Sequence, residues 1–198
     1  MSDPVRKIER PFTYRDYRGW PDDERWELID GVAWNMSPAP NRRHQGISMN
    51  LAFQIRQFLE KNPSSPCKLY LAPFDVLLPD QPGQEEDDVP TVVQPDLVVI
   101  CDPSRLTDKG AIGAPDWVVE ILSPWTSKKD FHEKLSLYER HGVREYWIID
   151  PAGRYLHVYK LDASGRYPAA PGVHLENDRV PSGVLTGLVA ELVRVFTE

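Results

Sequence analysis

Two acidic side chains stand in otherwise apolar segments of the sequence. Glu120 lies within the apolar run 117–122, and Asp96 follows a proline at the entrance of a second apolar run, 97–100. An ionised carboxylate in such surroundings is costly unless it is paired, protonated or bound to a cation. Two such acids together offer the hard oxygen ligands that Mg²⁺ prefers. We therefore expect Asp96 and Glu120 to form a divalent-metal site, with a buried salt bridge (Glu120) and a backbone cap (Asp96) as the structural alternatives.

A lysine on the next predicted element is positioned to join these acids. Apolar residues recur at helical spacing in residues 127–141, and Lys134 lies at the edge of that stripe. Its stem can therefore lie on the core while its ammonium group reaches toward Glu120. The alternative is an ordinary solvated lysine. Lys128 and Lys129, at the start of the helix, are expected to face solvent.

Two further acids compete for a role at this site. Asp116 shares a strand face with Glu120, but four strand residues separate them by roughly 13 Å, too far to share a metal ion. A cap at the start of the strand is the better interpretation for Asp116. Asp75 lies in the strand-like segment 68–78, where an exposed strand face accounts for a polar residue.

The elements around these residues predict an α/β fold, with a central mixed β-sheet flanked by α-helices and extra hairpin strands. The two near-continuous apolar runs are typical of central strands covered on both faces. Gly142 is expected to end the helix after the second run. The predicted helices are 14–20 (capped by Thr13), 44–60, 127–141 and 188–196. The predicted strands are 27–34 (a hairpin around an Asp-Gly turn), 68–78, 97–100, 117–122, 145–150 and 155–161. Residues 79–90 and 102–115 are expected to be polar connections.

Composition narrows the class of protein. The length of 198 residues suits one domain spanning residues 1–198. The net charge of −7 gives no electrostatic footprint for non-specific nucleic-acid binding, which counts against a DNA partner without excluding one. No apolar run approaches the roughly 20 residues of a membrane span, and the N-terminus shows no secretory signal. Cys67 and Cys101 are isolated in the sequence, which favours reduced buried thiols and a cytoplasmic location.

Several motifs together resemble a known family. They are Glu27-Leu28-Ile29-Asp30-Gly31, Pro95-Asp96, Glu120-Ile121-Leu122-Ser123-Pro124, Asp130, Lys134, Tyr138, residues 142–151, and Gly187-Leu188. They resemble the Uma-type family of restriction endonuclease-like proteins, within the PD-(D/E)XK nuclease superfamily. The resemblance covers a core of about residues 12–196. The block from Glu120 to Pro151 is its specific part, whereas the bare Pro-Asp pair is weak.

One position departs from the superfamily pattern. The generic motif has a lysine two residues after the second acid, and Leu122 occupies that position here. By analogy with the family, Lys134 on the following helix takes the place of this lysine. If Lys134 cannot reach the site, metal binding would survive without catalysis.

The resemblance implies hydrolysis of phosphodiester bonds in DNA, assisted by Mg²⁺ or Mn²⁺. Asp96 and Glu120 would hold one or two ions, and Lys134 would orient water or stabilise charge on the scissile phosphate. Glu27 would add an oxygen ligand, with a plain hairpin-edge acid as the alternative. His44 would hydrogen-bond a phosphate or order a ligand, with a satisfied core histidine as the alternative.

Two other classes of function stay open. A catalytically inactive nuclease-fold protein that binds nucleic acid or acts in regulation is favoured by Leu122 and by the acidic net charge. A purely structural network of the acids with Lys134 is the third possibility. The sequence contains no recognisable DNA-specificity element. Hairpins near the C-terminus offer a surface on which a homodimer could form.

Overall fold

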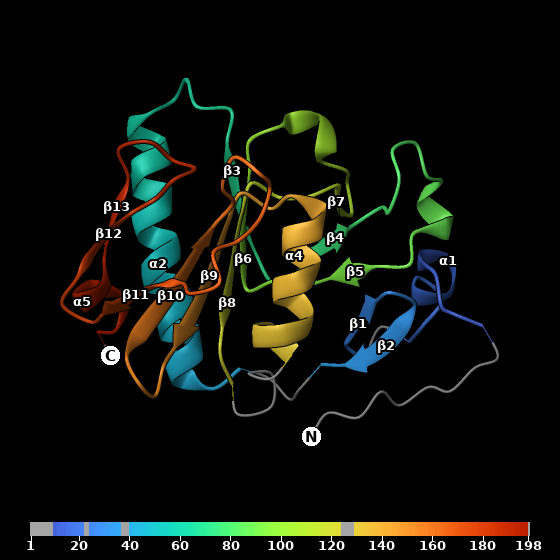
Figure 1. Cartoon of the computed structure of the whole chain (residues 1–198), viewed down its shortest axis with the longest axis horizontal. Coiled ribbons are helices and arrows are strands. Elements are labelled where there is room, and N and C mark those ends of the chain that lie inside the picture. Colours follow the sequence, from blue (N-terminus) through green and yellow to red (C-terminus); the bar gives the residue numbers. More distant parts are fainter. Residues whose placement is uncertain (1–9, 22–23, 37–39, 124–128, 198) are drawn as a thin grey trace.

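A six-stranded mixed sheet forms the centre of the molecule (Figure 1), in a computed structural model that describes residues 10–21, 24–36, 40–123 and 129–197. Its strand order is β11-β10-β9-β8-β6-β3. β8 and β9 are parallel and the other neighbours are antiparallel. The strands are β3 (Lys68–Leu71), β6 (Leu97–Ile100), β8 (Trp117–Ile121), β9 (Glu145–Asp150), β10 (Tyr155–Lys160) and β11 (Gly172–Leu175).

A second sheet of five strands has the order β2-β1-β5-β4-β7. Its strands are β1 (Trp26–Ile29), β2 (Val32–Asn35), β4 (Asp75–Leu77), β5 (Val92–Val93) and β7 (Gly110–Ile112). The predicted hairpin is present, and Asp30 (φ 51°) with Gly31 (φ 74°) forms its turn. The single strand predicted over 68–78 is wrong, because β3 and β4 divide it between the two sheets. β7 lies inside the predicted polar connection.

The helices α2 (Arg42–Lys61) and α4 (Leu135–His141) cover opposite faces of the six-stranded sheet. α2 matches the predicted helix, and the Asn41 side chain caps it by accepting a hydrogen bond from the His44 amide at 3.0 Å. The predicted helix 127–141 begins outside the described residues and continues as a π-helical turn, η3 (Asp130–Lys134), followed by α4 (Leu135–His141), which ends at Gly142 (φ 80°). The remaining elements are α1 (Tyr14–Tyr17), η1 (Glu86–Asp88), η2 (Pro103–Arg105), β12 (Arg179–Pro181), β13 (Val189–Glu191) and α5 (Leu192–Val195). The predicted terminal helix is therefore shortened by β13.

The central strands are buried on both faces, as their apolar runs predict. Odd-numbered side chains of β6 and β8, such as Val99 and Val119, pack into a core shared with α2. Even-numbered side chains, such as Val98 and Val118, pack into a second core shared with α4. This alternation places Glu120 on the α4 side of the sheet.

The structure also bears on the predictions about the two cysteines and about membrane-spanning helices. Cys67 and Cys101 form a disulfide, so the prediction of reduced thiols is wrong. The antiparallel register pairs Lys68 with Ile100, which brings the two flanking cysteines side by side. Among the helices in the described ranges, none combines the length and apolar character needed to cross a membrane.

Candidate functional site

Strand register brings the two predicted acids together. β6 and β8 are antiparallel, with Leu97 opposite Val119. Continuing this register by one residue places Asp96 opposite Glu120 on the α4 side of the sheet, the spacing at which cross-strand side chains interact. Asp96 Oδ2 also accepts a hydrogen bond from the Ile121 amide at 2.7 Å. The backbone of β8 therefore fixes the Asp96 carboxylate beside Glu120.

Lys134 reaches Glu120, as its place on the predicted helix suggests. Its Nζ lies 2.7 Å from Glu120 Oε1 and 3.8 Å from Asp130 Oδ1. The Tyr138 hydroxyl donates a second hydrogen bond to Glu120 Oε1 at 2.9 Å. Lys134 is only 2% exposed. It is therefore a buried partner of Glu120 and not a solvated helix lysine.

Glu27 joins the site from β1. Its Oε1 lies 2.8 Å from Lys134 Nζ and accepts a hydrogen bond from the backbone amide of Gln94 at 3.0 Å. Its Oε2 lies 2.5 Å from Lys129 Nζ. Glu27 is fully buried, at 0% exposure, so it is not a hairpin-edge acid. The prediction that Lys129 faces solvent is wrong, and Lys128 lies outside the described residues. We call Glu27, Glu120, Lys129, Asp130 and Lys134 the ion-pair cluster.

The π-helical turn explains why both lysines face Glu27. In a regular α-helix, five residues would place Lys129 and Lys134 about 140° apart around the axis. The wider π turn of η3 brings positions five apart toward the same side. Both ammonium groups can therefore bind one carboxylate.

His44 lies on the other side of Asp96. Its Nε2 is 3.2 Å from Asp96 Oδ2, and the ring also makes a hydrogen bond with the backbone of Ile121. Burial lowers the pKa of His44, but the hydrogen bond and charge of Asp96 outweigh burial, so the net pKa is raised. His44 is therefore tied to the same carboxylate and strand that the sequence places at the site.

The charges in the cluster shift one another's pKa values. Burial would raise the pKa of Glu27, but the positive charges of Lys129 and Lys134 outweigh it and hold the pKa below its usual range. For Glu120 burial dominates, and the neighbouring carboxylates add to it against the charge of Lys134, so the pKa is raised. The carboxylates around Lys134 outweigh the effect of its burial and raise its pKa, so this side chain stays an ammonium ion.

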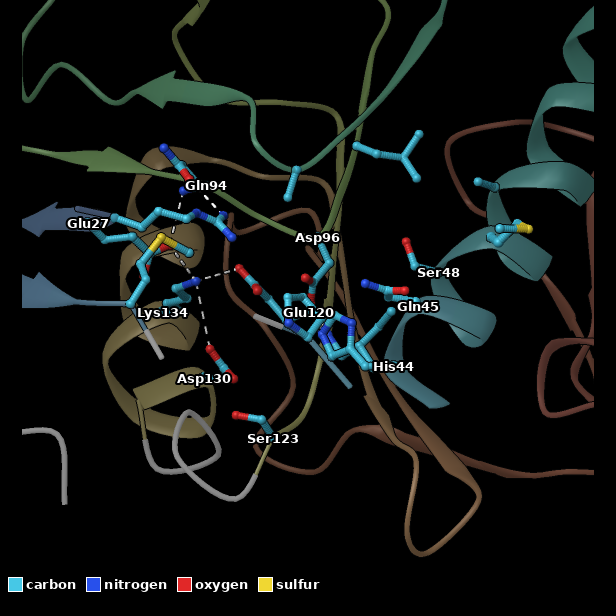
Figure 2. A pocket seen from close by; sticks show the side chains of 18 of the residues that line it. Glu27, His44, Gln45, Ser48, Gln94, Asp96, Glu120, Ser123, Asp130 and Lys134 are labelled. Atoms are coloured by element: carbon cyan, nitrogen blue, oxygen red, sulfur yellow. Dashed lines mark hydrogen bonds and ion pairs between the residues drawn. The ribbon is translucent and has the colours of Figure 1, made fainter. Parts of the chain in front are cut away.

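These side chains lie at the base of a pocket of about 800 Å³. Figure 2 shows His44, Gln45 and Ser48 of α2 on one side of it and Asp96 and Glu120 in the middle; on the other side lie Glu27, Gln94, Asp130 and Lys134. The pocket thus collects residues from β1, α2, β3, β8 and η3, together with Asp96 just before β6, around one space.

The donor set fits a divalent cation. Three carboxylates (Glu27, Glu120 and Asp130) face the two lysines, so negative charge is in excess among them, and Asp96 lines the same pocket. Within the part of the chain that the structure describes, no group of three or more His, Cys, Asp or Glu side chains is arranged as a metal site. Asp96 and Glu120 would therefore bind an ion as a carboxylate pair. This suits Mg²⁺, which usually keeps several waters and takes one or two carboxylates.

The competing acids have structural roles. Asp116 Oδ2 accepts a hydrogen bond from the Cys101 backbone amide at 2.6 Å, and its Oδ1 forms an ion pair with Arg144. Both contacts fit the predicted strand cap. Asp75 Oδ1 accepts hydrogen bonds from the side chains of Tyr17 and Gln94.

Sequence reasoning assigned no role at the site to Lys129, Asp130, Gln94 or Arg25. The one sequence signal for η3 is its charge: residues 129–134 contain two acids and two lysines. Gln94 and Arg25 carry no such signal, because pairing of β1 with β5 is what carries them into the pocket.

Comparisons with known proteins show which family and fold the chain shares. The family model Uma2, described as "Putative restriction endonuclease", matches residues 14–192. A solved structure of a "putative nuclease belonging to DUF820" from Anabaena variabilis has a TM-score of 0.71 and 23% sequence identity, covering 94% of this chain and 98% of that one. No curated protein matches the chain. Because the family model spans most of the sequence, the chain belongs to the Uma2 family of restriction endonuclease-like proteins.

Proposed function

We propose that this protein is an endonuclease that hydrolyses phosphodiester bonds of DNA with the help of Mg²⁺ or Mn²⁺. One observation carries the proposal: Lys134 bridges Glu120 and Glu27 at the base of a pocket that also contains Asp96. Membership of the Uma2 family gives this arrangement of two acids and a lysine its chemical context.

The residues would divide the work as follows. Asp96 and Glu120 would hold the ion, which supplies charge neutralisation and Lewis-acid assistance when bound. The Lys134 ammonium group is a compact positive charge that would stabilise negative charge building on the phosphate. Glu27 and the Tyr138 hydroxyl would keep Lys134 and Glu120 in place, because each makes a direct hydrogen bond or ion pair to one of them.

The alternative of an inactive binding or regulatory protein rests on Leu122. The side chain of Leu122 packs against the core on the α4 side and brings no amine to Glu120. Lys134 supplies that amine within 2.7 Å of Glu120, which favours a catalytic site. The net charge of −7 still favours the alternative.

Nicking of supercoiled plasmid DNA tests the proposal. With Mg²⁺ or Mn²⁺ we expect cleavage that EDTA stops, and Asp96→Asn and Lys134→Met should each lower the rate by about a hundredfold or more. Glu60→Gln and Lys61→Met, at the exposed end of α2, are matched controls that should keep the full rate. Because Lys134 is buried, a thermal melt of each variant must show that it is folded. Full activity in folded Asp96→Asn and Lys134→Met would refute the residue assignment.

The proposal also includes a cytoplasmic location and a homodimer. A cytoplasmic location stays a prediction, and the Cys67–Cys101 disulfide removes the argument from reduced thiols that the sequence offered for it. A homodimer also stays a prediction. Exposed Val173 and Leu175 on the edge strand β11 are the surface on which two copies would meet.

A further inference from the structure

The acids and lysines of the site lie below the molecular surface. Glu120 is 5% exposed and Lys134 is 2% exposed, and both line the bottom of the pocket. The Asp96 side chain, 18% exposed, is more accessible. A phosphate that contacts Glu120 or Lys134 must therefore enter the pocket, and a single strand can bend into a pocket more readily than a stacked duplex can.

One wall of the pocket is apolar and open. It is formed by one stripe of α2, where Met49 and Phe53 are four residues apart and so lie on the same face. Leu69 and Leu71, on one face of the edge strand β3, complete this apolar wall. Met49 is 69% exposed and Phe53 is 55% exposed, an unusual degree for large apolar side chains beside a charged site.

Two guanidinium groups also line the pocket. Arg25 donates a hydrogen bond to the Gln94 side chain, and its buried Nε has no hydrogen-bond partner among the residues that the structure describes. Arg56 lies on the same helix as the apolar wall and pairs with Glu60 on the surface. The pocket therefore combines an acidic base, an apolar wall and positive charge.

We propose that this pocket takes one unpaired nucleotide, with its phosphate toward Asp96 and Glu120 and its base against Met49, Phe53 and Leu71. The substrate would then be single-stranded or locally opened DNA in preference to intact duplex. This inference rests on the proposed nuclease function. Every base has an apolar face that can stack on an aromatic side chain, and in a duplex that face is covered by its neighbours.

The acidic net charge of the protein also favours an unpaired nucleotide over a duplex. Duplex binding without base contacts depends on many phosphate–lysine and phosphate–arginine contacts, and a net charge of −7 offers no excess of them. Stacking in the pocket supplies affinity that does not need a basic surface. A second copy of the chain is the rival occupant of the apolar wall. The nucleotide is favoured because the wall and the acids share one pocket.

Fluorescence anisotropy separates binding from cleavage. A labelled single-stranded oligonucleotide and the same sequence as a duplex are titrated in Ca²⁺, a hard cation that binds oxygen ligands. We expect tighter binding of the single strand. Phe53→Ala should weaken that binding by about fivefold to a hundredfold, and Phe53→Trp should preserve it. Val193→Ala, an exposed apolar residue on α5 that does not line the pocket, is the matched control and should bind as the unmodified protein does.

The outcomes distinguish this inference from the proposed function. Equal or tighter binding of duplex, or unchanged binding by Phe53→Ala, would overturn the nucleotide pocket while plasmid cleavage could still stand. A change from dimer to monomer in Phe53→Ala by analytical ultracentrifugation would also overturn it, because a second copy would then cover the wall. Binding of single strands that depends on Phe53, without cleavage of any DNA, would support the pocket and refute hydrolysis.

Discussion

Glu27 is the carboxylate on which both buried lysines converge, so we expect Glu27→Gln to destabilise the protein strongly. Lys134 Nζ lies 2.8 Å from one oxygen of Glu27 and Lys129 Nζ lies 2.5 Å from the other. Removing one partner of a buried pair costs about 3–5 kcal/mol, since it leaves a charge buried without compensation. Glutamine keeps the volume and one acceptor oxygen, which favours the lower end, about 3 kcal/mol. For a chain of this length that corresponds to a fall in Tm of about 6–12 °C.

Thermal unfolding followed by circular dichroism measures this change. Glu60→Gln is the control, because it removes an exposed carboxylate that pairs with Arg56. The double variant Glu27→Gln/Lys129→Met should recover part of the lost stability, because it removes the uncompensated lysine as well. If Glu27→Gln melts as Glu60→Gln does, the buried ion pairs of Glu27 contribute nothing and this reasoning is wrong.

Three further predictions concern metal, pH and redox state. Mn²⁺ at a hundred times its Kd should stabilise the protein by about 2.7 kcal/mol in a thermal shift assay, and Asp96→Asn should abolish the effect; an unchanged Tm would argue for a purely structural network. The pKa of Glu27 is lowered on folding, so its contribution to stability is present above the unfolded value of about 4.3 and is lost as the pH falls below it. Urea unfolding between about pH 5 and 3 should therefore cost the unmodified protein more stability than Glu27→Gln, and equal slopes would contradict this. Reducing the Cys67–Cys101 bond should lower the free energy of unfolding by about 3 kcal/mol, and a Cys67→Ser/Cys101→Ser variant should not respond to reductant.

The central sheet and the pair of acids could be predicted because burial on both faces leaves a direct trace in the sequence. The runs that contain Val98 and Val118 are apolar on both strand faces, so Glu120 within one run and Asp96 at the entrance of the other stand out. The one-residue extension of the β6–β8 register then places Asp96 opposite Glu120. That pairing is not visible in the sequence, but two adjacent central strands with one acid each leave few other arrangements.

The misassigned elements share a physical cause. Lys129 was expected in solvent because it lies at the start of the predicted helix, but the π turn of η3 brings it to the same carboxylate as Lys134. β4 and β7 are three residues each, and the pairing of β4 with both β5 and β7 defines these strands more than local preference does. Tertiary contacts decide such short segments, so single-sequence patterns carry little information about them.

The charge balance of the pocket links stability to chemistry. Burial raises the pKa of Glu120, and the charges of Asp130 and Asp96 add to this effect against the charge of Lys134. In the ion-pair cluster three carboxylates face two ammonium groups, so negative charge is in excess. Replacing Lys134 would increase this excess of negative charge, whereas a bound divalent ion would reduce it. The same variant should therefore lose stability without metal and regain part of it when Mn²⁺ is added. A Lys134→Met protein whose Tm does not respond to Mn²⁺ would show that the acids do not share an ion, and the metal-dependent proposal would fail with it.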